Sequence, residues 1–125
     1  MTLLLDSHVL LWSLHAPNKL VPAARRAIED GANVVFFSAA SIWEIAIKAG
    51  KGLLEIEDGL IAAIQEVGFA ELPVRAAHAW EVKALPSVHS DPFDRILVAQ
   101  ARAERLTLVT RDQFLGGYNI QLLPA

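Results

Sequence analysis

Short apolar runs alternate with longer helical patterns along this chain, and that alternation limits the folds open to it. The runs are too short to be buried helices, and residues 33–37 are β-branched and aromatic, so the runs predict strands. We expect strands at residues 2–5, 33–37, 69–72, 107–109 and 120–122. We expect helices at residues 9–14, 22–30, 39–49, 58–67, 75–84 and 91–104. Short apolar strands that alternate with helices predict a parallel sheet covered by helices on both faces.

Length and charge restrict the classes of protein to which this chain can belong. The chain has 125 residues and shows no linker or repeat, so we expect a single domain over residues 1–125. Lys and Arg number 11 against 14 Asp and Glu, for a net charge of −3. A protein that binds nucleic acid through bulk charge is basic, so contact with a polyanion here must be local or mediated by a cation. The lack of cysteine excludes thiolate nucleophiles and Cys-based zinc sites, and it fits a reducing cytoplasm.

The hydrophobic fraction of 54% does not indicate a membrane protein. No stretch without a charged side chain is longer than residues 31–43, which contain Asn33, Ser38 and Ser41, whereas a bilayer-spanning helix needs about 20 apolar residues in a row. The first residues reach Asp6 without a basic segment, unlike a signal peptide. We therefore expect a cytoplasmic protein that makes no membrane contact.

Four acidic residues stand where the predicted fold brings them together. Asp6 ends the first strand, and Asp112 follows a late strand. Glu44 lies in an otherwise apolar helix that follows a strand, and Asp94 lies in the first turn of another helix. Ligands bind beyond the carboxyl ends of the strands in parallel sheets, so we expect the four carboxylates to meet at that edge.

These acids also have structural explanations. Ser41 and Glu44 have the spacing of a capping box if their helix begins at Ser41 instead of Ser38. Asp91 and Asp94 suit the N-cap and first turn of a helix, where carboxylates bind unpaired backbone amides. One alternative is therefore a non-catalytic binding module whose acids only cap helices.

Taken together, the four carboxylates indicate a metal site. Gathered carboxylates repel one another, and a divalent ion removes that cost. Mg²⁺ and Mn²⁺ prefer carboxylate oxygens and water as ligands. Such ions activate water and neutralise the charge that builds on a phosphate. The chemistry that suits this arrangement is metal-dependent hydrolysis of phosphodiester bonds.

Four segments carry a family resemblance: Leu4–Trp12, Ser38–Ile45, His89–Arg95 and Leu108–Asp112. In this order they resemble the motifs of PIN-domain ribonucleases, and most closely those of the VapC-type toxins of bacterial type II toxin–antitoxin systems. The resemblance covers essentially the whole chain. It implies a three-layer α/β/α sandwich with a central parallel sheet, Mg²⁺ or Mn²⁺ in an acidic pocket, and hydrolysis of RNA. It also implies a cognate antitoxin protein as a partner.

Carried over residue by residue, the resemblance assigns the catalytic and metal-binding acids to Asp6, Glu44, Asp94 and Asp112. It allows Asp91 as an outer or alternative ligand, although the helix N-cap is the role that we favour. Ser7 and Thr110 occupy small hydroxyl positions beside the site, where they would hold a carboxylate or a water molecule.

Three basic residues are candidates for contacts with RNA phosphates: Lys48, Arg95 and Arg111. Arg95 and Arg111 each adjoin an acid, and Lys48 lies one helical turn beyond Glu44. The alternative is that each basic residue is only an ion-pair partner that lowers the pKa of the acid beside it.

Apolar helix faces indicate further contacts. Trp12, Trp43 and Trp80 fall among aliphatic helix residues, which favours core or interface packing over base stacking. The helical patterns at 9–14 and 42–49 carry more aliphatic surface than a small monomer needs. We therefore expect a homodimer or a groove for a protein partner.

A phosphotransfer protein is the rival enzyme class, because receivers and aspartyl phosphatases also use an Asp at a strand end. A phosphatase of that kind needs a second Asp two residues after the first, but His8 occupies that place after Asp6. A receiver needs a Lys after a late strand, where this chain has Arg111. His8 is instead placed to line the site beside Asp6.

Overall fold

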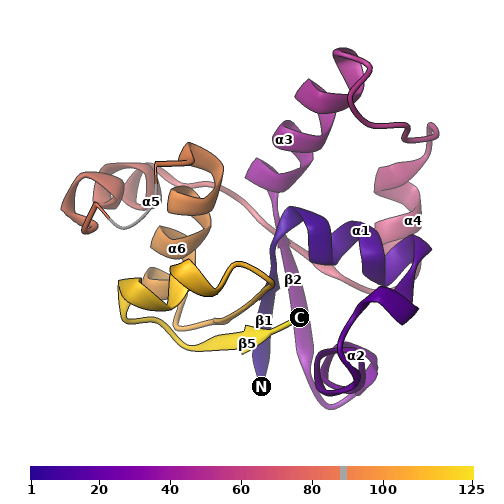
Figure 1. Cartoon of the computed structure of the whole chain (residues 1–125), viewed down its shortest axis with the longest axis horizontal. Helices are drawn as coiled ribbons and strands as arrows, with labels where there is room; N and C mark the ends of the chain where they lie inside the picture. Colours follow the sequence, from indigo (N-terminus) through magenta and orange to yellow (C-terminus); the bar gives the residue numbers. More distant parts are fainter. Residues whose placement is uncertain (88–89) are drawn as a thin grey trace.

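The computed structural model describes residues 1–87 and 90–125 (Figure 1). The strands are β1 (Thr2–Leu5), β2 (Val34–Ser38), β3 (Ala70–Leu72), β4 (Thr107–Thr110) and β5 (Leu122–Pro124). The α-helices are α1 (Ser7–His15), α2 (Pro22–Glu29), α3 (Ala39–Gly50), α4 (Leu60–Glu66), α5 (Ala76–Glu81) and α6 (Pro92–Glu104). The 3₁₀ helices are η1 (Pro17–Lys19), η2 (Val82–Ala84) and η3 (Gln113–Tyr118). His89, which begins the third family motif, lies outside the described residues.

The five strands form one parallel sheet in the order β3-β2-β1-β4-β5. The central strand β1 pairs on both sides, with Leu4 opposite Phe36 in β2 and Leu108 in β4. The chain builds the sheet outward from β1 to β3, then crosses back to place β4 on the other side of β1. This reversal makes the carboxyl ends of β1 and β4 a topological switch point, where parallel sheets bind ligands.

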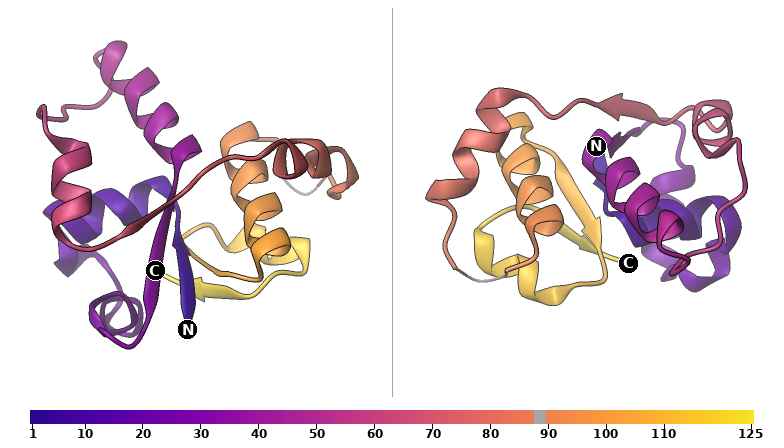
Figure 2. Two further views of the ribbon diagram at one scale, coloured as in Figure 1. Left: turned by 180° about the vertical axis from the view of Figure 1, so that it is seen from behind. Right: turned by 90° about the horizontal axis from the view of Figure 1, so that it is seen from above.

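Alternate residues of the central strands point into two separate cores. Leu3 and Leu5 belong to one cluster, together with residues of α1, α2, α3 and α4. Leu4 and Leu108 belong to the other cluster, together with residues of α6 and η3, and α5 packs against α6. Figure 2 shows the helices divided between the two faces of the sheet in this way. The predicted three-layer α/β/α sandwich with a central parallel sheet is therefore confirmed.

Side-chain caps set where the helices at the carboxyl edge begin. Ser38 accepts a hydrogen bond from the amide of Ala40 at 3.0 Å and begins α3. Asp91 accepts one from the amide of Phe93 at 2.8 Å and begins α6, with Pro92 in the first helical position. Both caps lie directly beside the carboxyl edge, so they aim the first turns of two helices at the switch point.

The helix that carries Glu44 begins at Ala39, with Ser38 as its cap. The capping-box explanation, which needed the helix to begin at Ser41, is therefore wrong. The helix begins earlier because β2 continues to Ser38, and the Ser38 hydroxyl caps the helix as soon as the strand ends.

Two expected elements, the helix at 58–67 and the strand at 120–122, begin two residues later in the structure. α4 begins at Leu60 because Gly59 has a φ of 95°, in the left-handed region that a right-handed helix does not use. β5 begins at Leu122 because η3 continues to Tyr118 and Asn119 turns the chain with a φ of 57°.

The tryptophans are less buried than their helical spacing suggests. Trp43 and Trp80 are 64% and 71% exposed, so neither packs in the core, and of the two expected kinds of packing only the interface is left open for them. The helix expected at 75–84 divides into α5 and η2, and Trp80 lies on its solvent side. Trp12 is half-buried against the first core cluster. Among the described residues, no helix combines the length and the apolar character needed to cross a bilayer.

Candidate active site

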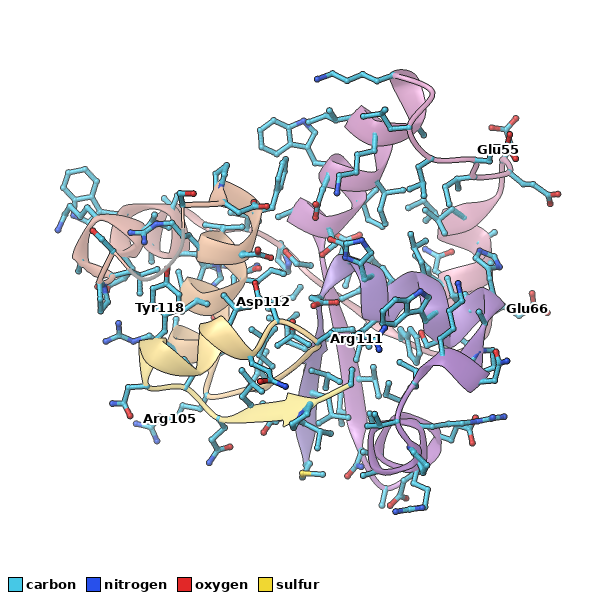
Figure 3. The ribbon with its side chains drawn as sticks, in the orientation of Figure 1. Glu55, Glu66, Arg105, Arg111, Asp112 and Tyr118 are labelled. Atoms are coloured by element: carbon cyan, nitrogen blue, oxygen red, sulfur yellow. The ribbon has the colours of Figure 1, made fainter. Side chains whose placement is uncertain are left out.

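A cavity of about 410 Å³ opens at the carboxyl edge of the sheet, beyond β1 and β4. We call it the acidic pocket. Its walls come from the start of α1, the middle of α3, the first turn of α6 and the segment after β4, which runs between α6 and α1 in Figure 3. The lining residues are Asp6, Ser7, His8, Trp12, Glu44, Lys48, Asp91, Asp94, Arg111 and Asp112. The structure thus brings the four predicted acids, and Asp91, to one cavity.

Asp6 lies at the floor of the acidic pocket and is only 8% exposed. Its backbone amide donates to the carbonyl of Val109 at 3.1 Å, which fixes it beside β4. Its Oδ1 accepts a hydrogen bond from the amide of Val9 at 2.8 Å, so it is also the N-cap of α1. Burial raises the pKa of Asp6 above the ordinary value of 3.8, against the opposing effects of Thr110, Val9 and His8. Burial disfavours the charged form of this carboxylate, and a bound cation would stabilise that form.

Glu44 faces the pocket from α3 and is also 8% exposed. Its Oε1 accepts a hydrogen bond from the hydroxyl of Ser7 at 2.6 Å. Its Oε2 accepts one from the ammonium of Lys48 at 2.8 Å, one helical turn further along. The hydrogen bond to Glu44 raises the pKa of Lys48. Ser7 therefore holds a carboxylate, which is one of the roles predicted for it.

The remaining acids approach from the other side of the pocket. Asp91 and Asp94 lie at the N-cap and in the first turn of α6, and both are half-buried. Asp91 therefore has the capping role that the sequence favoured, while it also lines the cavity. Asp112 follows β4, and its amide donates to the hydroxyl of Thr110 at 3.0 Å. Thr110 is buried, and this hydrogen bond ties the segment after β4 to the end of the strand.

An aromatic and cationic wall completes the pocket. The guanidinium of Arg111 lies 4.9 Å from the ring centre of Trp12, within the range of a cation–π contact. The rings of His8 and Trp12 are 6.0 Å apart. The sequence favoured core or interface packing for Trp12 over base stacking, and the signal for its second role was its spacing of one helical turn from His8. Trp12 thus supports a positive charge at the pocket.

Arg95 does not line the acidic pocket, although it directly follows Asp94. Its guanidinium donates hydrogen bonds of 2.9 to 3.3 Å to the carbonyls of Val82, Leu85 and Pro86. It also donates to the hydroxyl of Tyr118 at 3.2 Å. The structure therefore places Arg95 as a clamp that joins α6 to the segment after α5 and to η3.

The carboxylate oxygens that line the acidic pocket suit a hard divalent ion as ligands. Two of these carboxylates, however, are already held by hydrogen bonds from the protein. Among the residues that the structure describes, no three His, Asp or Glu side chains stand in an arrangement that could hold a metal ion. The cap to Val9 holds Asp6, and Ser7 and Lys48 hold Glu44. Carboxylate and hydroxyl oxygens are nevertheless the ligands that Mg²⁺ and Mn²⁺ prefer, and the Lys48 ammonium already stands as a cation beside Glu44. The residues present therefore fit such an ion by their chemistry.

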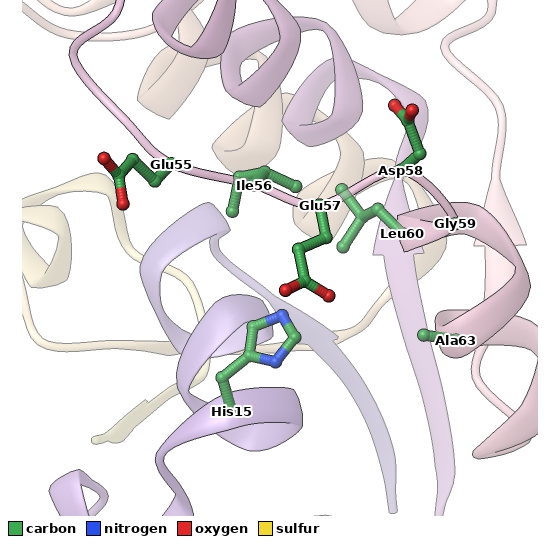
Figure 4. A pocket seen from close by; sticks show the side chains of 8 residues that line it. All are labelled: His15, Glu55, Ile56, Glu57, Asp58, Gly59, Leu60 and Ala63. Carbon is green, nitrogen blue, oxygen red and sulfur yellow. The ribbon is translucent and has the colours of Figure 1, made fainter.

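A second acidic hollow, of about 350 Å³, lies between α1 and the loop before α4 (Figure 4). The carboxylate of Glu57 points toward the ring of His15. Glu55, Glu57 and Asp58 come from one short segment and are exposed to solvent. Water screens the repulsion between such acids, so this hollow gives no reason to infer a metal site.

Comparison with known proteins identifies the family and agrees with the fold. The model of the PIN domain family matches residues 3–115. Ribonuclease VapC22 of Mycobacterium tuberculosis is 32% identical over 117 residues, which cover 91% of this chain and 89% of that protein.

Two solved DNA-bound structures are similar in fold. The structure of VapBC2 from Rickettsia felis bound to a promoter DNA fragment aligns with a TM-score of 0.71 and 14% identity, covering 99% of this chain and 98% of that chain. The DNA-bound VapBC of Salmonella typhimurium aligns with a TM-score of 0.66 and 14% identity, again covering 99% and 98%. At such low identity these two structures show the shared fold alone.

Proposed function

This chain belongs to the PIN domain family, and from that premise we propose that it is a metal-dependent endoribonuclease that acts as the toxin of a type II toxin–antitoxin pair. The observation that carries the proposal is the acidic pocket itself. Acids from four separate elements line one cavity at the switch point of the sheet. A relative with 32% identity over most of its length is a ribonuclease, which favours RNA cleavage over the phosphotransfer and binding-module alternatives.

Asp6, Glu44, Asp94 and Asp112 are the residues that would hold Mg²⁺ or Mn²⁺ in this pocket. When bound, such an ion supplies Lewis acidity, activates water and offsets charge on the phosphate.

The chain's own groups set up the rest of the site. The hydroxyl of Ser7 orients Glu44 through Oε1, and the amide of Val9 orients Asp6. Arg111, held over Trp12, is placed to bind an RNA phosphate beside the acids. Lys48 is the other cation on the pocket wall.

The proposal includes the partners that the sequence resemblance implies. A cognate antitoxin would bind this chain and control the nuclease, and the chain would act as a homodimer on cytoplasmic RNA. An apolar surface that would serve such contacts includes the exposed ring of Trp43, which stands edge-on to Phe93 at 5.2 Å.

Cleavage of RNA by the purified full chain tests the proposal. We expect an internally labelled RNA to be cut in the presence of Mn²⁺ or Mg²⁺ and to stay intact with EDTA. Asp94→Asn should lower the rate by more than about 100-fold, because even outer partners of metal ligands cost 10- to 100-fold. Cleavage that persists in EDTA, or that survives in both Asp6→Asn and Asp94→Asn, would contradict the proposed site.

A further inference from the structure

Lys48 carries a positive charge into the acidic pocket from the same helix as Glu44. Its Nζ lies 2.8 Å from Oε2 of Glu44, and its side chain is 42% exposed against 11% for Glu44. The other oxygen of Glu44 accepts the 2.6 Å hydrogen bond from Ser7. Both oxygens of this carboxylate are therefore bound to donors of the protein itself.

The surroundings of Lys48 differ from those of an ordinary surface ion pair. A lone pair of opposite charges one helical turn apart on an exposed face contributes little to stability. Here Asp91 and Asp94, on a different helix, also act electrostatically on the ammonium. The charge of Lys48 therefore interacts with carboxylates of both α3 and α6, and it offsets repulsion between acids that line the same cavity.

We propose that Lys48 is the resident counter-cation of the acidic pocket, and that a divalent ion displaces its ammonium from Glu44 on binding. The inference rests on the proposed metal-dependent function. A divalent ion and an ammonium group compete for the same carboxylate, so the lysine weakens metal binding while it stabilises the metal-free pocket. Metal occupancy then depends on a charge that the protein itself supplies.

Calorimetric titration of the full chain with Mn²⁺ alone tests this proposal without an activity measurement. Two neutral variants, Lys48→Met and Lys48→Gln, remove the charge, and Lys48→Arg keeps it. Lys51→Met, on an exposed residue at the end of the same helix, removes the same net charge away from the pocket. We expect Mn²⁺ to bind both neutral Lys48 variants about tenfold more tightly than the unchanged protein, because a nearby unit charge no longer repels the ion.

The controls distinguish a failure of the Lys48 inference from a failure of the proposed metal-dependent function. Lys48→Arg and Lys51→Met should bind Mn²⁺ as the unchanged protein does, and the neutral Lys48 variants should show the larger rise in Tm on Mn²⁺ addition. Equal Mn²⁺ affinity in the neutral Lys48 variants and the unchanged protein overturns the inference but leaves the proposed function standing. An equal gain in Lys51→Met also overturns it, because net charge alone would then explain the effect. No Mn²⁺ binding in any variant overturns both the inference and the proposed metal site.

Discussion

At the scale of single residues, the carboxylate of Asp6 affects the stability of the fold in two opposite ways. Its carboxylate caps α1, which stabilises the fold, but its burial disfavours the charged form. Burial raises its pKa above 3.8, so between that value and the raised pKa the folded protein binds more protons than the unfolded chain. The free energy of unfolding therefore falls as the pH rises through this window and stays lower above it.

Replacing Asp6 with Asn should therefore stabilise the metal-free protein at neutral pH. Asn keeps an oxygen that can accept the hydrogen bond from Val9 but has no charge to bury. Urea unfolding in EDTA at a series of pH values should show an advantage of Asp6→Asn that grows with pH through the window and then levels off. Asp6→Ala is the control, since it also loses the cap, at a cost of about 1 kcal/mol relative to Asn. An Asp6→Asn protein less stable than the unchanged chain at neutral pH would contradict the electrostatic explanation.

At the same scale, the sequence predicted the identities of the pocket acids better than their contacts. Asp6 was identifiable because an acid directly after an apolar strand lies at the carboxyl edge of a parallel sheet. The ion pair of Lys48 with Glu44 could be considered from their spacing, but the hydrogen bond from Ser7 to Glu44 could not. That hydrogen bond joins residues 37 positions apart, and it depends on how α1 and α3 pack.

At the scale of elements, the start of α6 organises one wall of the pocket. Asp91 Oδ1 accepts from the amide of Phe93 at 2.8 Å and from that of Asp94 at 3.4 Å, so one carboxylate positions the turn that bears Asp94. The Asp-Pro pair made this helix start predictable, because Asp and Pro are favoured at the N-cap and the next position.

We expect Asp91→Asn to keep both the stability and most of the RNA cleavage, because Asn is an equally good N-cap. Asp91→Ala should lower the free energy of unfolding by about 1 kcal/mol and reduce cleavage, since the first turn of α6 loses its cap. Urea unfolding and cleavage rates, measured on the two variants in parallel, separate these effects. Loss of cleavage in a fully stable Asp91→Asn protein would show that the Asp91 charge itself takes part in the reaction.

Arg95 marks the limit of prediction from sequence at this scale. Its place after Asp94 suggested a phosphate contact, whereas its guanidinium donates to three backbone carbonyls and to Tyr118. Backbone carbonyls carry no sequence signal, because every residue has one. Only the path of the chain after α5 brings them to the start of α6.

This clamp should contribute measurably to stability. Arg95→Ala removes several charge-assisted hydrogen bonds at once and should lower the free energy of unfolding by about 2 to 3 kcal/mol. Arg95→Lys should recover only part of the loss, because an ammonium cannot reproduce the fork of a guanidinium. Urea unfolding measures both, with Arg102→Ala, on the exposed last turn of α6, expected within about 0.5 kcal/mol of the unchanged chain. An Arg95→Ala protein as stable as that control would contradict the clamp.

At the scale of the whole molecule, the balance of charge decides how this protein can hold RNA. Its net charge of −3 excludes binding by bulk attraction, and the parallel sheet gathers acids at the pocket, which increases the local repulsion of phosphate. Contact with RNA must then depend on few cations in defined places. Arg111 is such a cation, since it lines the acidic pocket and is held over the ring of Trp12 at 4.9 Å.

The salt dependence of RNA binding should therefore be shallow and should depend on Arg111. In an Asp94→Asn background that does not cleave, Arg111→Gln should reduce the slope of log K against log salt by about 0.7, the value for one phosphate contact on a single strand. Arg102→Gln removes the same charge from the far end of α6, so its slope should stay that of the parent. Fluorescence anisotropy of a labelled single-stranded RNA at several salt concentrations gives all three slopes. Equal slopes in the Arg111 and Arg102 variants would mean that Arg111 binds no phosphate, and that the pocket holds RNA through its acids and their cation alone.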